Sequence, residues 1–551
     1  MFTRLSSSGG RTYLQLVEAY RTDDGATRQR VIANLGRLDK LEPKHLDPLI
    51  NGLNRALGRA VNPAQPVSYD SALAYGDVFA LHQLWNDLGF GDALKRALRS
   101  SRRGFDAEAL VRAMVFNRLC DPHSKLGVLR WLETVAIPGM PDAVTHDQLL
   151  RTMDALMDRG DAVEASVSKL IRPLIDQELS VVFYDLTTVR IHGEGVVADD
   201  VRAFGMNKET AGIARQFVLG LVQTSDGLPL MHTVHPGNVA ETKTLRAMLE
   251  AVLERFDVQR VILVADRGLL SLDNVAQLAE VAAASTRRIE FILAVPARRY
   301  AELGGTMDRL AFVDGIAEGR FADHRLVVAH DPARATEQGT RRRERIAELQ
   351  TFADRLVEKL DAQDGGLAER GRRATDRGAY SRFARALADA ELTRFVRADF
   401  QADRFSYDID EAAITQAERF DGKLVLLTSV TDFSAIEIID RYKSLADIER
   451  GFRVLKSDIE IAPVFHRLPE RIRAHALICY LALVLYRIMR MRLKASGAGL
   501  SPTSALQLLG RIQKHRAMIG ETTYTGVSRM TPQQIQLFEN LNLAKPPVRS
   551  L

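Results

Sequence analysis

The order of hydrophobic and polar positions divides the chain into stretches with different periods. Between about Tyr13 and Leu38 apolar residues alternate with polar ones, and Asp23-Asp24-Gly25 interrupts the alternation. A period of two with a central turn predicts two paired strands. Three arginines lie near the rim of these strands: Arg21, Arg28 and Arg30. We therefore expect a small N-terminal β element in residues 1–68.

A helical period follows. From about Ser71 to Ile175 apolar residues recur every three or four positions, as in AEALVRAMVFNRLC and HDQLLRTMDALMDRG. This pattern predicts a helical domain in residues 69–176.

From Leu179 short runs of β-branched residues replace the helical period. Three runs that could form hairpins, SVVFYD, QFVLGLVQT and LPLMHTVHPG, precede an alternation of helix and strand that includes RVILVAD and IEFILAVP. The order predicts an α/β domain, a mixed sheet with flanking helices, in residues 177–490. Residues 297–420 interrupt it with strand-like pieces and the basic helix start GTRRRERIAELQ, which indicates an insertion. Residues 491–551 are predicted to form a C-terminal helical region.

Length and composition narrow the class of protein. A chain of 551 residues is long enough for several domains. The apolar run ALICYLALVLYRIM meets Arg487 and Arg490 too soon to span a bilayer, and the N-terminus lacks the apolar core of a signal peptide. We expect a cytoplasmic protein without a membrane partner. Cys120 and Cys479 lie far apart, which argues against disulfides and thiolate metal clusters, and the net charge of +5 favours an anionic partner only weakly.

One predicted helix, Arg441 to Asp458, carries an unusual polar face. Tyr442, Glu449 and Lys456 stand seven residues apart, so on one continuous helix they lie almost in line, with Arg453 one turn beyond Glu449. For this helix alone, a solvated face with a Glu449–Arg453 ion pair is the favoured explanation of the pattern. A functional interpretation needs partners for Glu449.

Two aspartates are candidate partners for Glu449. Asp185 ends the run VVFYD and Asp266 ends VILVAD, so both are expected at the rim of the sheet, where α/β folds bind ligands. Either aspartate alone could be a helix cap or a turn former. Together with Glu449 they form an all-oxygen set, which selects Mg²⁺ or Mn²⁺ over Zn²⁺. Two such ions would relieve the repulsion among the carboxylates and catalyse in-line attack on a phosphodiester.

The positions of Asp185 and Asp266 and the stretch YKSLADIERGFRVLK resemble the DDE transposases of bacterial insertion sequences, in the IS-four-like group. That group has a signature of Tyr, two residues, Arg, three residues, Glu, six residues, Lys. Tyr442, Glu449 and Lys456 match it, whereas Leu445 stands at the Arg position. YLQLVEAYRTDDGATRQRVIANLGRL, FNRLCDPHSKLGVLRWL and FHRLPERIRAHALICYLALVLYRIM are similar to segments of the IS-sixteen-thirty-four branch.

The resemblance implies a fold and a reaction. The fold is an RNase H-like core split by a largely β insertion. The reaction is binding of a homodimer to terminal inverted repeats, cleavage at the element ends, and transfer of 3′-OH ends into target DNA with two Mg²⁺ ions per site, in a bacterial, nucleoid-associated setting. Asp185, Asp266 and Glu449 would hold the metals. Two alternatives stay open: a catalytically inactive or domesticated DNA-binding protein, and a metal-dependent nuclease that cuts without joining.

Several basic or aromatic side chains are candidates for DNA contacts: Tyr442, Arg453, Lys456, Arg467, Arg471 and Arg473. A solvated face explains the last three almost as well. The run Arg341-Arg342-Arg343 fits either DNA or a helix start balanced by acidic residues. His475 falls within an apolar pattern and is expected to be a hydrogen-bonded core histidine.

Overall fold

A computed structural model describes most of the chain. The described residues are 1–59, 67–99, 104–174, 180–193, 200–207, 212–240, 243–256, 258–265, 272–321, 323–365, 373–519 and 522–547.

The N-terminal unit is an antiparallel three-stranded sheet followed by a helix. Its strands are β1 (Phe2–Ser8), β2 (Arg11–Arg21) and β3 (Thr27–Arg37), in the order β1-β2-β3. The predicted turn is confirmed: Gly25 has a positive φ, and the amide of Thr22 donates to the carbonyl of Ala26. The sequence pattern missed β1 and the helix α1 (Pro43–Ala56).

A mixed sheet of nine described strands forms the centre of the body, as the α/β pattern predicts. The order is β11-β12-β15-β10-β9-β5-β7-β6, with β8 also paired to β7. The bounds are β5 (Ser180–Arg190), β6 (Ala203–Asn207), β7 (Gly212–Thr224), β8 (Pro229–Pro236), β9 (Arg260–Ala265), β10 (Arg288–Ala294), β11 (Ile316–Phe321), β12 (His324–His330) and β15 (Lys423–Thr428). β9 runs parallel to both β5 and β10, and the other described strand pairs of this sheet are antiparallel. Residues 261–265 of β9 are all buried, in keeping with a central strand covered on both faces.

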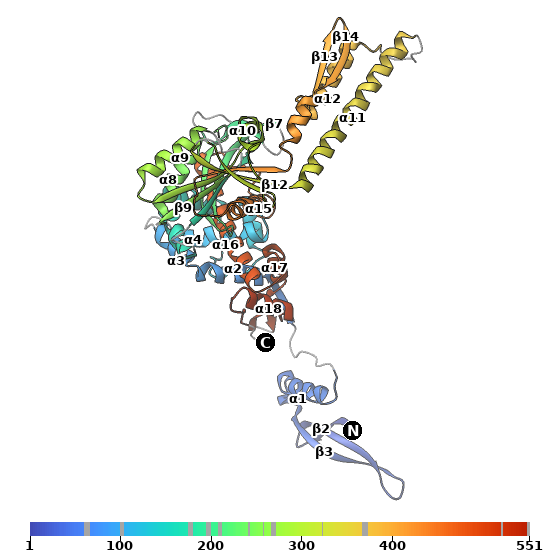
Figure 1. The fold of residues 1–551 in the computed structure, drawn as a ribbon. Helices are drawn as coiled ribbons and strands as arrows, with labels where there is room; N and C mark the ends of the chain where they lie inside the picture. Colours follow the sequence, from blue (N-terminus) through green and yellow to red (C-terminus); the bar gives the residue numbers. More distant parts are fainter. Residues whose placement is uncertain are drawn as a thin grey trace.

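Helices cover the sheet and extend into the predicted helical domain (Figure 1). The helices that follow β8 and β9 in sequence are α8 (Leu245–Arg255) and α9 (Leu272–Ala284). The helical domain contains α2 (Gly76–Asp87), α3 (Phe90–Ala97), α4 (Ala107–Cys120), α5 (Lys125–Leu132), α6 (His146–Asp158) and α7 (Gly160–Ile171).

A long buried helix, α16 (Pro469–Ala495), joins the helical domain to the sheet. It packs against α4 and α6 on one side and β8 on another. Its apolar window is long enough to cross a membrane by composition, but 94% of that window is buried within the protein. Consequently a single hydrophobic core runs through the helical domain, the sheet and the C-terminal helices.

The insertion is mainly helical, so the expectation of a largely β insertion is wrong. After α10 (Tyr300–Met307), the strands β11 and β12 join the central sheet. The rest forms an arm that projects from the body (Figure 1). The arm contains α11 (Pro332–Asp364), α12 (Asp376–Asp389), the hairpin β13 (Val396–Gln401) and β14 (Arg404–Ile409), and α13 (Glu411–Glu418).

The arm has its own core. In α11 the buried residues are Ile346, Leu349, Ala353, Leu356 and Leu360, at alternating spacings of three and four. This is a helical seam, and it faces a similar stripe on α12 that includes Phe383. With 33 residues, α11 is about 50 Å long at 1.5 Å per residue.

The C-terminal region also differs from the helical prediction. Between α17 (Pro502–Leu509) and α18 (Pro532–Asn540) lie two strands, β16 (Gln513–Ile519) and β17 (Thr522–Val527). β16 pairs with β4 (Val67–Ala74), which follows the N-terminal unit in sequence, and the sheet order is β17-β16-β4. The region therefore depends on a strand from the other end of the chain.

Candidate active site

Asp185 lies within β5, the strand between β7 and β9. It is half-buried, and its Oδ1 accepts a hydrogen bond of 2.8 Å from the amide of Leu186. On the antiparallel side Asp185 stands opposite Leu221 of β7. On the parallel side the preceding residue, Tyr184, stands opposite Ala265, the last residue of β9.

Asp266 follows Ala265 in the sequence and lies outside the described residues. The described part of β9 ends at Ala265 beside Tyr184.

The predicted single helix from Arg441 to Asp458 is two helices in the structure. α14 (Ala435–Lys443) ends before Ser444, and α15 (Ala446–Ser457) begins after Leu445. The hydroxyl of Ser444 donates to the carbonyl of Asp440 at 3.0 Å, and the amide of Leu445 bonds the carbonyl of Tyr442 three residues back. Such side-chain bonds to the preceding turn bend helices. Tyr442 therefore belongs to a different helix from Glu449, and no continuous helix aligns the two.

α15 carries Glu449 beside the strand of Asp185, because the helix packs against both β5 and α16. Phe452 and Leu455 are buried on its inner face, whereas Glu449 and Arg453 are exposed. Both of these exposed side chains are described, yet no ion pair joins them, so the simple Glu449–Arg453 pairing is not formed. The Glu449 carboxylate has no hydrogen bond or ion pair with any described residue. Within the described part of the chain, the exposed Glu449 carboxylate is therefore not neutralised by a cation.

A close contact that the sequence pattern missed holds α15 against the sheet. Gly451 is buried, and a Cβ added there would lie 2.5 Å from Nε2 of Gln223 on β7. Gln223 is fully buried, and neither its Oε1 nor its Nε2 has a hydrogen-bond partner among the described residues. A glycine inside a helical pattern, two residues after a candidate ligand, was the available signal of close packing.

The arginines at the start of α16 differ in their surroundings. Arg467 is exposed. Arg471 forms a bidentate pair with Asp154 of α6, at 2.7 and 2.8 Å, and this carboxylate raises the pKa of Arg471 above its ordinary value. Arg473 donates to the carbonyl of Val234 in β8 at 3.0 Å. Arg471 and Arg473 therefore tie α16 to its neighbours.

The imidazole of His475 is buried, as expected for a core histidine. Its Nε2 lies 2.9 Å from the carbonyl oxygen of Ile461. Burial, followed by the nearby charges of Lys125 and Arg118, lowers the pKa of His475 well below its ordinary value.

Comparison with protein families identifies the chain. Residues 3–66 match the N-terminal domain of the IS1634 family transposases, and residues 176–485 match the transposase DDE domain. The chain is a DDE transposase of the IS1634 branch. The family predicted from Tyr442, Glu449 and Lys456 is thus confirmed, and DNA transposition is its function.

Other comparisons add less. A solved structure of the piggyBac transposase synaptic complex with hairpin DNA is similar at a TM-score of 0.40 and 8% identity, covering 79% of each chain. A TM-score of this size is too low to carry a structural argument. No curated protein sequence matches the transposase.

The donor atoms of the transposase suit a hard divalent cation. Asp185 and Glu449 carry carboxylate oxygens on two elements that pack together, β5 and α15, and no described residue pairs with the Glu449 carboxylate. The described residues alone contain no group of three or more His, Cys, Asp or Glu that could hold a metal, and Asp266 is outside that set. Oxygen ligands fit Mg²⁺ or Mn²⁺.

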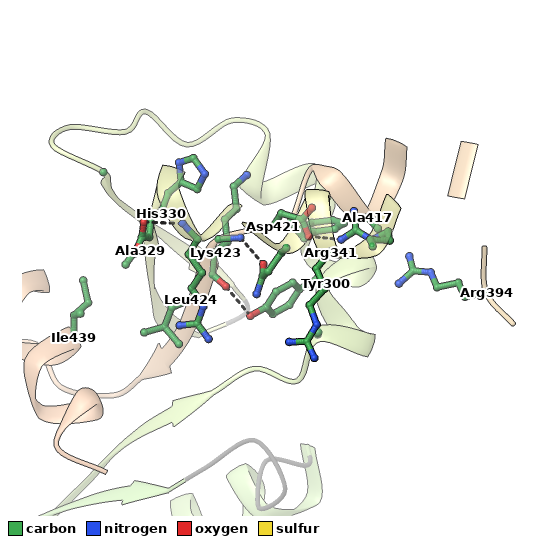
Figure 2. A pocket seen from close by; sticks show the side chains of 18 of the residues that line it. Tyr300, Ala329, His330, Arg341, Arg394, Ala417, Asp421, Lys423, Leu424 and Ile439 are labelled. Carbon is green, nitrogen blue, oxygen red and sulfur yellow. Dashed lines mark hydrogen bonds and ion pairs between the residues drawn. The ribbon is translucent and has the colours of Figure 1, made fainter. Parts of the chain in front are cut away.

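A basic hollow lies where the arm of the transposase leaves the sheet (Figure 2). It has a volume of about 840 Å³. Its cationic side chains outnumber its four carboxylates: Arg334, Arg341, Arg342, Arg345, Arg394, Lys423 and Lys443.

The arginine run at this hollow is only partly free. Arg342 pairs with Asp421, and Arg343 pairs with Glu418 at 2.7 Å, so both attach α11 to the residues before β15. Arg341 is exposed and lines the hollow. One of the three arginines is therefore available to an anionic partner.

Proposed function

We propose that the transposase cuts phosphodiester bonds at the ends of its element and joins the 3′-OH ends to target DNA, with Asp185, Asp266 and Glu449 as the metal ligands. The observation that carries this proposal is the packing of α15 on β5, with Glu449 lacking any described partner. Two divalent ions held there would supply an activated nucleophile and stabilise the leaving oxygen.

The strand order supports an RNase H-like core. In the order β8-β7-β5-β9-β10 the first three strands are antiparallel neighbours, and β9 and β10 follow parallel to β5. Ala265, the last residue of β9, stands opposite Tyr184 in the middle of β5. Asp185 and Asp266 then approach the substrate from the sheet, and Glu449 approaches from α15.

The other side chains on and near α15 would position DNA. Arg453 is exposed one turn beyond Glu449, and Lys456 is half-buried a further turn along. Both cations are suited to phosphate oxygens. Tyr442, on α14, would contact the DNA from a separate helix. Arg467 and the exposed Arg341 extend the basic surface to the start of α16 and the base of the arm.

The N-terminal unit is proposed to recognise the terminal repeats. Its match to the IS1634 family domain and its exposed arginines, Arg21, Arg28 and Arg30, support this role. We expect a homodimer on DNA, acting in the cytoplasm, and light scattering of the protein with end DNA tests the stoichiometry.

Cleavage of a labelled duplex carrying the repeat that flanks the gene tests the proposal. Wild type should cut at the repeat end with Mg²⁺ or Mn²⁺ and not with EDTA. Asp185→Asn, Asp266→Asn and Glu449→Gln should each abolish cutting but bind the duplex within about twofold of wild type, because phosphate contacts supply most of the affinity. Glu348→Gln, an exposed glutamate on α11, is the matched control and should cut normally.

The outcomes separate the alternatives. Normal cutting by Glu449→Gln would remove it from the ligand set. Binding without cutting under any metal would identify an inactive DNA-binding protein. Metal-dependent cutting without joined products in the presence of target DNA would identify a nuclease.

A further inference from the structure

A second cavity, of about 480 Å³, lies between the helical domain and the segment that joins α15 to α16. One wall is the connection from α4 to α5, and the opposite wall is formed by residues 460–468. Its basic and histidine side chains are Arg118, His123, Lys125, His146, His466, Arg467, Arg471 and His475. Glu460 is the one carboxylate among the lining residues that the structure describes, and it is exposed.

Lys125 is the first sign that this cavity is built for an anion. It is the first residue of α5, only 4% of it is exposed, and it forms no hydrogen bond or ion pair with any described residue. Burial, followed by the charge of Arg118, lowers the pKa of Lys125 to about 7. Lysines are almost never buried without a partner, since an unpaired buried charge is costly.

Arg118 adds a second buried cation without a carboxylate. It is 5% exposed, and it donates to the backbone carbonyls of His123, Ile459 and Glu460. Its Nε has no partner among the described residues. Neutral carbonyls satisfy some of its donors but leave its positive charge uncompensated.

Two histidines that line the cavity, His466 and His475, lie in the same positively charged environment. Burial and the neighbouring cations, Lys125 foremost, lower the pKa of His466 to about 3. Nδ1 of His475 is buried and has no hydrogen-bond partner in the described part of the chain. Two acidic groups beside the lining residues are already engaged, because Asp154 pairs with Arg471 and Asp121 pairs with His123.

We propose that this cavity binds a phosphate group through Lys125 and Arg118. A phosphate supplies several strong acceptor oxygens and the negative charge that the two buried cations lack. The absence of buried carboxylates among the described lining residues argues against a metal cation. The mouth carries exposed apolar side chains, Leu126, Phe465 and Leu468, so the ligand group enters past a partly apolar rim.

The cavity is connected to the candidate active site through the chain. Val464, in its wall, bridges to Ile191 just beyond β5, with the amide of His192 donating to the Val464 carbonyl at 2.8 Å. Six residues along an extended strand separate Ile191 from Asp185, or about 20 Å. The same wall continues directly from α15, which carries Glu449. If the phosphate belongs to DNA, a role that rests on the proposed function, the cavity would hold a DNA strand about 20 Å from the bonds that react.

Equilibrium dialysis of radiolabelled inorganic phosphate against the full chain, at constant ionic strength set with chloride, tests the proposal. Wild type should bind about one phosphate per chain, and Lys125→Met should weaken binding at least tenfold. Lys169→Met, which removes an exposed lysine of α7, is the matched control and should bind as wild type does. Two results would overturn the proposal. One is that wild type binds no phosphate at concentrations up to roughly 10 mM, an affinity too weak for a built site. The other is equal binding of phosphate by wild type and Lys125→Met.

A second measurement does not depend on the variant folding. Lys125 in the wild-type protein should be acetylated by dilute acetic anhydride, and phosphate should slow its labelling about fivefold or more while leaving Lys169 unchanged, as read by mass spectrometry. Equal labelling of Lys125 with and without phosphate would contradict the assignment.

The salt dependence of DNA binding identifies the source of the phosphate. If it is a DNA phosphate, Lys125→Met should lower the log–log salt slope of end binding by about 0.9. An unchanged slope, with inorganic phosphate binding lost, would assign the cavity to a free phosphate or phosphorylated small molecule. Neither arm needs cleavage, so failure here would leave the assignment of Asp185, Asp266 and Glu449 unaffected.

Discussion

Substitution of Gly451 by alanine tests how α15 is held on the sheet. The added methyl group would lie 2.5 Å from Nε2 and 3.2 Å from Oε1 of Gln223, and 3.2 Å from a guanidinium nitrogen of Arg487. Gln223 is fully buried and cannot move into solvent. The substitution should therefore push α15, and with it Glu449, away from β5 and β7.

The magnitude follows from two opposing effects. Alanine in place of glycine inside a helix stabilises by about 1 kcal/mol. Overpacking of a close-packed contact costs about 1–3 kcal/mol. Gly451→Ala should thus lower the free energy of unfolding by about 0–2 kcal/mol. Gly339→Ala in α11 is the control, because its methyl group meets only an ordinary 3.8 Å contact and should give the full stabilisation of about 1 kcal/mol.

Urea unfolding of both variants, together with end cleavage, measures the effect. The two should differ in stability by about 1–3 kcal/mol. Cleavage by Gly451→Ala should fall on the order of 10²-fold, since a 1 Å displacement of a catalytic group has effects of this size. Gln223→Ala removes the obstructing amide, so the double variant should be more stable than the sum of the single effects by at least about 1 kcal/mol.

Two results would refute this reasoning. One is equal stabilisation by Gly451→Ala and Gly339→Ala. The other is additivity of Gly451→Ala and Gln223→Ala within about 0.5 kcal/mol, which would mean that the two side chains do not compete for the same space.

Three further predictions concern other parts of the protein. Glu108→Ala should lower the free energy of unfolding by about 3–5 kcal/mol, because it leaves Arg112 buried without the carboxylate that it bonds at 3.1 Å; a loss below about 1 kcal/mol in urea would contradict this. In phosphate-free buffer the free energy of unfolding of wild type, relative to that of Lys125→Met, should rise from pH 7 toward pH 10.5. The lysine of the unfolded chain stays protonated over this range, whereas the buried Lys125, with its pKa of about 7, loses its proton. A difference in stability that does not change with pH would mean that the Lys125 ammonium is solvated. Arg28→Ala should weaken end binding and lower the slope of log affinity against log salt concentration by about 0.9, without changing the cleavage rate at saturating protein. Gel-shift titrations at several salt concentrations measure this slope, and an unchanged slope would contradict a phosphate contact by Arg28.

Local patterns in the sequence predicted the central strands well. β5 and β9 begin where the runs SVVFYD and RVILVAD begin, because continuous β-branched residues favour a strand buried on both faces, but β5 extends beyond its run to Arg190. The helical domain was equally accessible from its period of three to four. The three carboxylates were found from strand ends and helix spacing, and the family resemblance then supplied the reaction.

Local sequence patterns could not predict which distant strands pair with one another. β11 and β12 have the composition of strands, but nothing local shows that they extend the central sheet. The largely β insertion was an expectation from the family resemblance, whereas the sequence pattern had indicated a helix start at GTRRRERIAELQ, which lies in α11. The break at Ser444 has no Gly or Pro to mark it, and it depends on a hydroxyl bond to Asp440.

In the candidate site the sequence identified residues but not their contacts. Glu449 lies on a helix, as predicted, but Asp185 does not end its strand as expected, because β5 continues for five residues to Arg190 through its pairing with β7. The contact between Gly451 and Gln223, and the engagement of Arg471 by Asp154, arise from packing between elements far apart in the chain. Such contacts depend on the tertiary fold and cannot be inferred from spacing.

The pairing of β4 with β16 has a consequence for synthesis of the protein. β4 ends at Ala74, and its partner begins only at Gln513. Ribosomes add roughly 5–20 residues per second, so on the order of half a minute passes before the second strand exists. Throughout that interval the nascent chain carries an open strand edge, which invites pairing with other chains. The sheet of β4 and β16 can form only after Ile519 has been translated. A truncated messenger RNA that ends before that point would therefore yield an incompletely folded chain that proteases degrade.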